Sequence, residues 1–215
     1  MAKTKTAYVC SECGATALQW FGSCPACGTA GSLTETITER GLARPGGKAG
    51  AAPIALAEVV TRELARAGTG SEELDRALGG GLVAGQVVLL GGDPGIGKST
   101  LLLQAVCALG KDALYMTGEE SAEQVAGRAK RLDLDAAGVQ LLAETQLERI
   151  VGALDAAKPR VAVIDSIQTV WSEALQSAPG SVAQVRECAA QLTRFAKRAG
   201  TALLLIGHVT KEGAI

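Results

Sequence analysis

The chain has 215 residues, of which 47% are hydrophobic and only 3% aromatic, and its formal net charge is -1. This length suffices for one well-packed domain and a small appendage, and the near-neutral charge does not by itself predict nucleic-acid binding. We find neither an apolar run long enough to span a bilayer nor a signal peptide, so we expect a soluble cytoplasmic protein without a membrane partner.

Four of the six cysteines are clustered near the N-terminus. Cys10 and Cys13 form one C-x-x-C pair, Cys24 and Cys27 form another, and ten residues separate the pairs. Clustered cysteines of cytoplasmic proteins bind metal more often than they form disulfides, and two such pairs suit a tetrahedral four-thiolate Zn²⁺ site. We therefore predict a zinc ribbon over residues 1–33 that its metal stabilises and that has no open position for catalysis. Redox chemistry or an iron–sulfur centre is the less favoured alternative.

Packing is the simplest interpretation of five other aromatic and cysteine residues. Tyr8, Trp20 and Phe21 in the ribbon could form a stacking surface for nucleic-acid bases, but we favour their packing within the ribbon. Cys107 and Cys188 lie inside helical patterns and are expected to be small buried hydrophobic residues.

Residues 34–55 are expected to form a flexible linker, since residues 41–50 are rich in glycine and lack apolar periodicity. From residue 56 onward, apolar strand patterns alternate with helical patterns, which predicts an α/β core with a mainly parallel sheet between helical layers. The expected strands are 86–91, 112–117, 139–143, 160–165 and 201–207. The expected helices are 72–78, 98–109, 122–131, 146–157 and 182–199.

A phosphate-binding loop connects the first of these strands to its helix. The segment from Gly92 to Ser99 matches the pattern G-x-x-x-x-G-K-[ST] at every fixed position. Its backbone N–H groups can surround a phosphate, Lys98 can reach the β- and γ-phosphates, and the Ser99 hydroxyl can hold Mg²⁺. The residues expected to bind a nucleoside triphosphate are Gly92, Asp93, Pro94, Gly95, Ile96, Gly97, Lys98, Ser99 and Thr100.

Carboxylates follow two of the apolar strands. Asp165 ends one of them and is expected to support the Mg²⁺ shell with Ser99 as the direct ligand, although it could be an ordinary helix-cap aspartate. Glu119 and Glu120 follow the strand after the phosphate-loop helix, where a carboxylate can polarise a water for attack on the γ-phosphate. We favour Glu119 over Glu120 as this base. Alternatively, both are acidic residues that favour a helix start.

The last expected strand is followed by His208, the only histidine of the chain. It lies on the same edge as Asp165 and could sense the γ-phosphate, and a structural role is equally open. The sequence ends at Ile215 without a helix that closes the domain, so we expect a truncated chain and an incomplete core over residues 56–215.

Taken together, these motifs resemble the RadA/Sms DNA repair proteins, through segments that occur in the same order along the chain. The matching segments are residues 10–14, 24–28, 69–82, 91–104, 117–121, 164–169 and 207–213. The four-cysteine ribbon and the nucleotide-binding core occur together in that family, which makes the resemblance specific.

The resemblance implies a RecA-like P-loop NTPase core and a bacterial ATP hydrolase that requires Mg²⁺ and depends on DNA. It further implies a role in homologous recombination and DNA repair, promoting branch migration or unwinding of recombination intermediates. The implied partners are single-stranded or branched DNA, the RecA recombinase, and further copies of the chain in a hexameric ring. The family continues with a Lys-Asn-Arg-Phe-Gly motif and a protease-like domain, both absent from this sequence.

Two other hypotheses compete with a DNA-dependent motor. The chain could be an ATP-gated binding module, in which the ribbon recruits DNA or a protein without motor activity. A small-molecule kinase would need a substrate lid and clustered arginines, which we do not find. Six basic residues are candidates for DNA contact, although we favour solvated helix faces as their explanation: Arg128, Lys130, Arg131, Arg194, Lys197 and Arg198.

Overall fold

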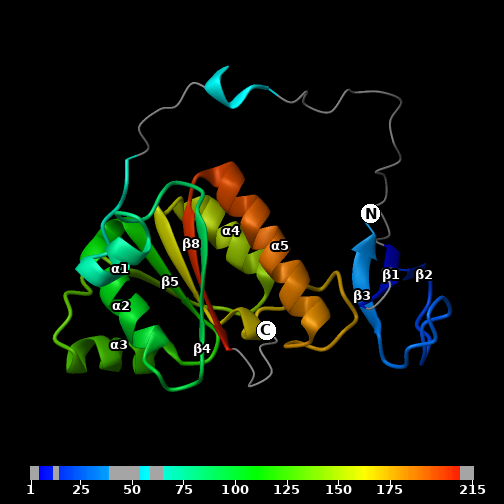
Figure 1. Ribbon diagram of the computed structural model, residues 1–215. Coiled ribbons are helices and arrows are strands. Elements are labelled where there is room, and N and C mark those ends of the chain that lie inside the picture. The colour runs from blue at the N-terminus through cyan, green and yellow to red at the C-terminus, as the bar shows by residue number, and fades with distance from the viewer. Residues whose placement is uncertain (1–4, 12–14, 39–53, 59–64, 209–215) are drawn as a thin grey trace. The chain divides into compact units, whose positions relative to one another are not determined.

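The computed structural model describes residues 5–11, 15–38, 54–58 and 65–208. The chain divides into two compact units, residues 1–64 and residues 65–215, which are described separately below (Figure 1). Residues 34–38 of the expected linker belong to a strand of the N-terminal unit, so the flexible linker does not begin at residue 34, and residues 39–53 lie outside the described residues.

The N-terminal unit contains a three-stranded antiparallel sheet with the strand order β2–β1–β3. Its strands are β1 (Lys5–Cys10), β2 (Thr16–Ala17) and β3 (Leu33–Thr38). Its buried core consists of Cys10, Cys24 and Leu33, with Tyr8 and Ala15 packed against them. Because so few apolar side chains are buried, this unit requires a further source of stability, which a metal would supply.

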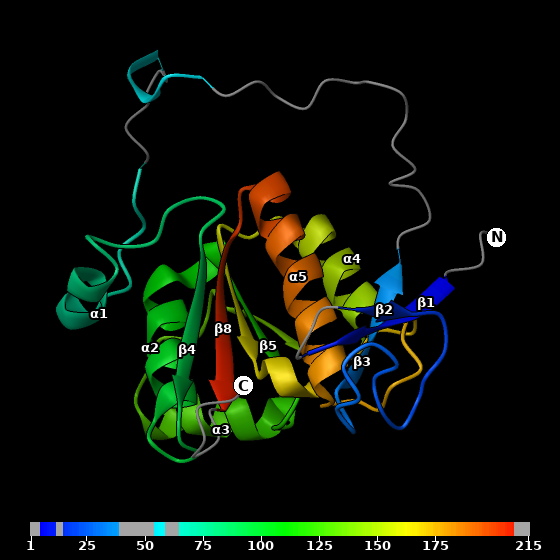
Figure 2. The ribbon, with the colours of Figure 1, turned by 45° about the vertical axis from the view of Figure 1, so that its right-hand side comes forward.

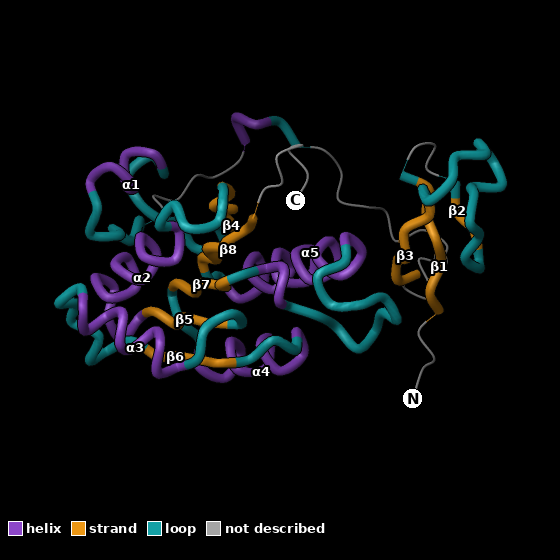
Figure 3. The backbone as a smooth tube through the Cα atoms, turned by 90° about the horizontal axis from the view of Figure 1, so that it is seen from below, coloured by secondary structure: helices purple, strands orange, loops and turns teal. Residues whose placement is uncertain are grey.

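The C-terminal unit contains a five-stranded sheet in the order β4–β8–β7–β5–β6, and every neighbouring pair is parallel (Figure 3). Its strands are β4 (Val87–Gly92), β5 (Ala113–Thr117), β6 (Gln140–Ala143), β7 (Val161–Asp165) and β8 (Ala202–His208). Because the strands are parallel, their carboxyl ends lie at a common edge of the sheet, where ligands bind in open α/β sheets.

Helices cover both faces of this sheet, with α2 and α3 on one face and α4 and α5 on the other (Figure 2). The α-helices are α1 (Glu72–Ala77), α2 (Lys98–Leu109), α3 (Ala122–Arg131), α4 (Leu147–Ala157) and α5 (Val182–Ala199). Short 3-10 helices are Leu56–Glu58, Gly110–Asp112 and Ile167–Thr169. Each expected strand and helix is present with boundaries within one residue of the prediction, so the α/β fold with a mainly parallel sheet is confirmed. None of the described helices has the length and apolar character needed to cross a membrane.

The central strands are buried on both faces, as their apolar sequences predicted. In β7, Ala162 and Ile164 pack in the cluster with α4 and α5, whereas Val161 and Val163 pack in the cluster with α2 and α3. Side chains alternate between faces along a strand. Asp165, the last residue of β7, therefore falls on the α2 face at the carboxyl edge.

The helices differ in how their N-termini are capped. Side chains of Ser71, Ser121 and Ser181 accept a hydrogen bond from a backbone N–H of the first turn of α1, α3 and α5, respectively. Helix α2 instead begins after Gly97, which has no side chain to cap it. The first N–H groups of α2 are thus available for another acceptor, such as a phosphate oxygen.

Two glycines are expected to respond to alanine substitution in opposite directions. Gly152 lies exposed inside α4, and an added Cβ would have no atom within 4 Å, so Gly152→Ala should increase the free energy of unfolding by about 0.5–1 kcal/mol. Gly70 has a φ of +77°, and an added Cβ would lie 2.6 Å from the Cβ of Ala108. Gly70→Ala should therefore decrease the free energy of unfolding by more than about 1 kcal/mol. Urea denaturation measures both changes. An unchanged free energy of unfolding in Gly70→Ala would contradict the close approach of residue 70 to α2.

Candidate active site and metal centre

The phosphate-loop segment lies where the sequence placed it, between the end of β4 and the start of α2. Gly95 and Gly97 have φ values of +82° and +96°, a conformation that side chains with a Cβ rarely adopt. Gly92 has a φ of +152°, and an added Cβ would lie 2.6 Å from the Cδ1 atom of Ile96. These glycines allow the backbone to curve tightly in front of the α2 N-terminus.

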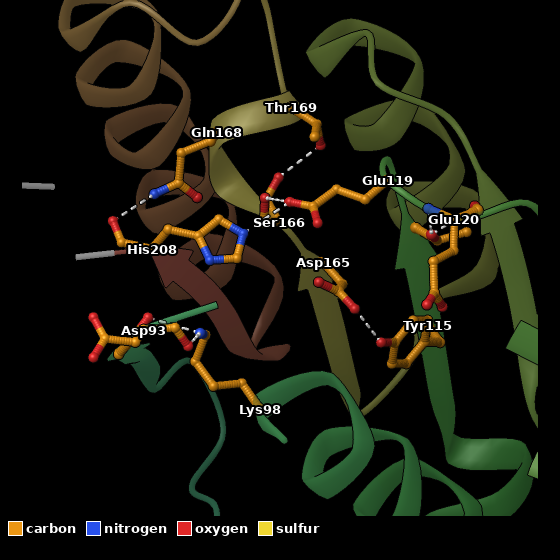
Figure 4. Close-up of polar contacts among 12 residues, drawn as sticks. Asp93, Lys98, Tyr115, Glu119, Glu120, Asp165, Ser166, Gln168, Thr169 and His208 are labelled. Atoms are coloured by element: carbon orange, nitrogen blue, oxygen red, sulfur yellow. Dashed lines mark hydrogen bonds and ion pairs between the residues drawn. The ribbon is translucent and has the colours of Figure 1, made fainter. Parts of the chain in front are cut away.

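Lys98 is the buried cation of this loop, with only 7% of the residue exposed. Its Nζ atom donates hydrogen bonds of 2.7 Å to the backbone carbonyl oxygens of Gly92 and Asp93 (Figure 4). Ser99 and Thr100 follow in the first turn of α2 and are partly buried. A buried ammonium beside uncapped helix N–H groups fits a triphosphate, because both favour a negative ligand.

Asp165 stands at the end of β7 and is 5% exposed. Its Oδ2 atom accepts a hydrogen bond from the hydroxyl of Tyr115, and its backbone oxygen accepts one from the N–H of Gly118. The peptide bond between Asp165 and Ser166 is cis. A carboxylate here and the hydroxyl of Ser99 are oxygen donors of the type that Mg²⁺ prefers, so the residues present fit the expected ion.

Glu119 lies at the centre of a hydrogen-bonded group at the carboxyl edge (Figure 4). Its Oε1 atom accepts a 2.5 Å hydrogen bond from Ser166 Oγ and lies 3.0 Å from Nε2 of His208. Burial raises the pKa of Glu119, but the hydrogen bonds from Ser166 and His208 and the charges of His208 and Lys98 outweigh it. The pKa is held below its usual range, so Glu119 is a carboxylate at neutral pH.

Glu120 has a different environment from Glu119. Its Oε2 atom lies 2.5 Å from Nη2 of Arg128, whose side chain is only 10% exposed. The hydroxyl of Thr117 donates a 2.8 Å hydrogen bond to the carbonyl oxygen of Glu120 and accepts one of 3.1 Å from the N–H of the same residue. Glu120 thus forms an ion pair with Arg128 of α3, whereas Glu119 is hydrogen-bonded to residues at the ends of β7 and β8.

Arg128 corrects one expectation about the basic residues. It is neither on a solvated helix face nor exposed for DNA, because its guanidinium is buried and pairs with Glu120. Lys130, Arg131, Arg194, Lys197 and Arg198 are exposed, as both solvated helix faces and DNA contact require, so the interpretation as solvated helix faces stays a prediction for them.

Gly118 allows the turns after β5 and β7 to approach one another. A Cβ at this position would lie 2.1 Å from Oγ1 of Thr169, which itself donates a 2.8 Å hydrogen bond to the carbonyl oxygen of Ser166. Sequence reasoning missed the roles of Gly118, Ser166 and Tyr115. The available signals were a glycine directly before Glu119, a hydroxyl directly after Asp165, and one polar side chain within an apolar strand.

The predicted histidine of the site is present at the end of β8, with a third of its side chain exposed. Besides the contact with Glu119, the backbone oxygen of His208 accepts a 3.2 Å hydrogen bond from Nε2 of Gln168. The structure thus brings together the ends of β5, β7 and β8 around one carboxylate.

Three of the four expected zinc ligands gather in the N-terminal unit. The sulfur atoms of Cys10, Cys24 and Cys27 all lie within 4.8 Å of one another, and those of Cys10 and Cys27 are 3.6 Å apart. Two thiolates on one tetrahedral zinc ion, at about 2.3 Å each, are separated by roughly 3.8 Å, so the donor set fits Zn²⁺. The fourth expected ligand, Cys13, lies outside the described residues.

The aromatic and cysteine packing predictions are partly confirmed. Tyr8 packs against the small core of the ribbon and Cys188 is fully buried. Trp20 and Phe21 are 60% and 39% exposed, so their predicted packing is wrong, because this core is too small to enclose an indole. Cys107 is only half buried and lines a cavity of about 500 Å³ between the segment before α1, helix α2 and the segment after α3.

The fold and the phosphate loop define a nucleotide-binding α/β domain, and comparison with known proteins gives its family. Residues 57–214 match the family model of the AAA domain, and residues 8–35 match that of the rubredoxin metal binding domain. The chain therefore belongs to the AAA domain family.

Curated relatives confirm the resemblance to the RadA/Sms DNA repair proteins. The chain is 56% identical to DNA repair protein RadA of Pseudomonas aeruginosa over 221 residues and 48% identical to that of Haemophilus influenzae over 225 residues. These matches cover 100% of the chain and 49% of each relative, so the chain spans about half their length. A KaiC-like protein of Pyrococcus horikoshii is similar in fold, with a TM-score of 0.58 and 20% identity over 71% of this chain and 74% of that one.

Gly118→Ala is expected to displace the turn that carries Glu119. The new methyl group would overlap Thr169 Oγ1, and the two turns would have to separate. We expect ATP hydrolysis to fall by about tenfold or more, since a shift of about 1 Å at a reacting group costs up to a hundredfold. Steady-state hydrolysis assays test this. Gly127→Ala in α3 is the matched control, because a Cβ there meets no atom within 4 Å, and an equal loss in both variants would contradict the prediction.

Removal of zinc is expected to unfold the ribbon and leave the C-terminal unit folded. Trp20 lies in the ribbon and Trp171 in the C-terminal unit, so a Trp171→Phe variant reports on the ribbon alone by fluorescence. We expect one zinc per chain by elemental analysis and a change of Trp20 emission on chelation, with the far-UV circular dichroism largely retained, because zinc-binding free energy is folding free energy in such small units. Unchanged Trp20 emission after complete zinc removal would contradict a structural role.

Proposed function

We propose that this chain is the ATP-hydrolysing part of a DNA repair protein. The observation that carries the proposal is the position of Glu119. Its carboxylate is ionised and hydrogen-bonded at the carboxyl edge of the sheet. The phosphate loop begins at this edge, and Asp165 and His208 are the last residues of their strands there. A carboxylate at that place can accept the proton of a water that attacks the γ-phosphate in line.

The other residues of the edge have complementary roles in this reaction. Lys98 and the N-terminal N–H groups of α2 bind the phosphates and stabilise the charge that develops on them. Ser99 and Asp165 would hold Mg²⁺, which neutralises charge between the β- and γ-phosphates when bound. His208 contacts the base directly, so it is positioned to exchange this contact for the γ-phosphate and to report the nucleotide state to the residues that follow β8.

For the whole protein we propose the role of a DNA-dependent ATPase in homologous recombination. The support is the high identity to relatives named DNA repair protein RadA. In this proposal a hexameric ring in the bacterial cytoplasm uses ATP to drive branch migration or unwinding on single-stranded or branched DNA, with the RecA recombinase as partner. The zinc ribbon, whose strand β3 extends to Thr38, and the ATPase core from residue 56 act as separate units joined by the intervening segment.

Glu119→Gln and Glu120→Gln are expected to differ, although the residues are neighbours. Glu119→Gln removes the base and should lower hydrolysis about 10²- to 10⁴-fold with ATP binding retained. Glu120→Gln weakens the pair with Arg128 and should cost of order 1 kcal/mol of stability with a much smaller effect on the rate. Single-turnover hydrolysis, nucleotide binding and urea denaturation separate the two. If Glu120→Gln lost more activity than Glu119→Gln, the base would be misassigned.

The DNA dependence is tested with this chain and with a form of the length of its relatives, each with and without single-stranded DNA. A motor predicts a higher rate of ATP hydrolysis with DNA in the longer form. A rate that DNA leaves unchanged, together with ATP-dependent binding of DNA or RecA, would favour a nucleotide-gated binding module. Lys98→Ala is the control for both forms, because it should abolish hydrolysis without unfolding the domain.

A further inference from the structure

A phenol hydroxyl lies buried beside the aspartate of the active site. Tyr115 occupies the middle of β5 and is fully buried, and its ring belongs to the apolar cluster between the sheet and helices α2 and α3. The hydroxyl donates a hydrogen bond to Oδ2 of Asp165, and Figure 4 shows the other carboxylate oxygen pointing away from Tyr115. A phenylalanine would fill nearly the same volume, so the hydroxyl itself requires an explanation.

The strand register determines this contact. Tyr115 pairs directly with Val163 of β7, and Asp165 lies two residues further along on the same face of the sheet. Neighbouring strands lie about 4.8 Å apart and two residues advance a strand by about 6.6 Å, so such diagonal neighbours are about 8 Å apart, which is within reach of a tyrosine side chain. Because both strands are buried on both faces, neither side chain can turn away without disturbing the core.

The physical chemistry favours a permanent donor at this position. A buried hydroxyl without a partner costs about 1–3 kcal/mol, which the carboxylate of Asp165 offsets. A tyrosine hydroxyl is protonated at neutral pH, and Oδ2 of Asp165 is the acceptor to which this one donates.

We propose that Tyr115 is a positioning residue that acts through Asp165. Its hydroxyl occupies Oδ2 and fixes the orientation of the carboxylate, so that the other oxygen is presented to the metal shell. This inference rests on the proposed function, in which Asp165 supports Mg²⁺. In a purely structural role, the hydrogen bond to Asp165 would only satisfy a buried hydroxyl, and the Mg²⁺ concentration required for activity would not depend on Tyr115.

The test is the Mg²⁺ dependence of ATP hydrolysis by Tyr115→Phe in the full chain. Loss of a hydrogen bond to a charged group should raise the Mg²⁺ concentration for half-maximal activity about 3- to 10-fold and lower kcat by a similar factor, with KM for ATP at saturating Mg²⁺ changed less than about twofold. Tyr8→Phe in the ribbon is the matched control and should change neither quantity. A folded Tyr115→Phe protein with the Mg²⁺ dependence of the parent would overturn the proposal.

A double-mutant cycle shows whether Tyr115 acts through Asp165. In an Asp165→Asn background, Tyr115→Phe should change the residual rate less than about twofold, since the effect of one partner disappears when the other is removed. Two independent, multiplying effects would contradict the inference.

Metal binding without turnover separates this inference from the proposed function. We expect Mn²⁺ affinity in the presence of ADP, measured by electron paramagnetic resonance, to fall about 3- to 10-fold in Tyr115→Phe by the same loss of a hydrogen bond. Tyr115→Met, which removes the hydroxyl by a different side chain, should give the same shift if the phenylalanine variant folds poorly. If Lys98→Ala still hydrolysed ATP, the proposed function would fail. If Lys98→Ala were inactive but Mn²⁺ affinity were unchanged in both Tyr115 variants, only the positioning role would fail.

Discussion

The parallel direction of the five core strands is the constraint on which the rest of the domain depends. Parallel strands require crossover connections, and the helices in these connections cover both faces of the sheet. The faces are therefore filled by apolar side chains, and polar chemistry is concentrated at the carboxyl edge. Gly92, Thr117, Asp165 and His208 each end a different strand at that edge, so one topological feature assembles the site from distant parts of the sequence.

The order of the strands then decides which of these residues meet. Strand β8 lies between β4 and β7, and β5 lies on the other side of β7. Glu119, which follows β5, consequently contacts Ser166 after β7 and reaches His208 at the end of β8. The close passage of the β5 and β7 turns requires Gly118, whose missing Cβ leaves room for Thr169. The position of the Glu119 carboxylate thus depends on a residue that carries no functional group.

The elements could be predicted from the sequence because local patterns determine them. Strands such as 161–165 are apolar up to their last residue, and α1, α2, α3 and α5 begin after a serine or at the phosphate loop. Strand order and register depend on long-range packing, which a single sequence does not reveal. For this reason the sequence favoured Glu119 over Glu120 without showing how their environments differ: Arg128 of α3 pairs with Glu120 and not with Glu119. The exposure of Trp20 also depends on the size of a core that local patterns do not measure.

Lys98 and Glu119, two charged groups of the site, have hydrogen-bond partners within the protein itself. Lys98 donates to two carbonyl oxygens of its own loop, and Glu119 is held by Ser166 and His208. Partly buried charges without hydrogen-bond partners would destabilise the fold, which explains these internal contacts. In the proposed function, a triphosphate would compete for the same donors, because its oxygens would accept from Lys98 and its γ-phosphate would replace Glu119 as the partner of His208. Nucleotide binding would then be coupled to the release of Glu119, since the loss of the contact with His208 would free the carboxylate to accept a proton from water.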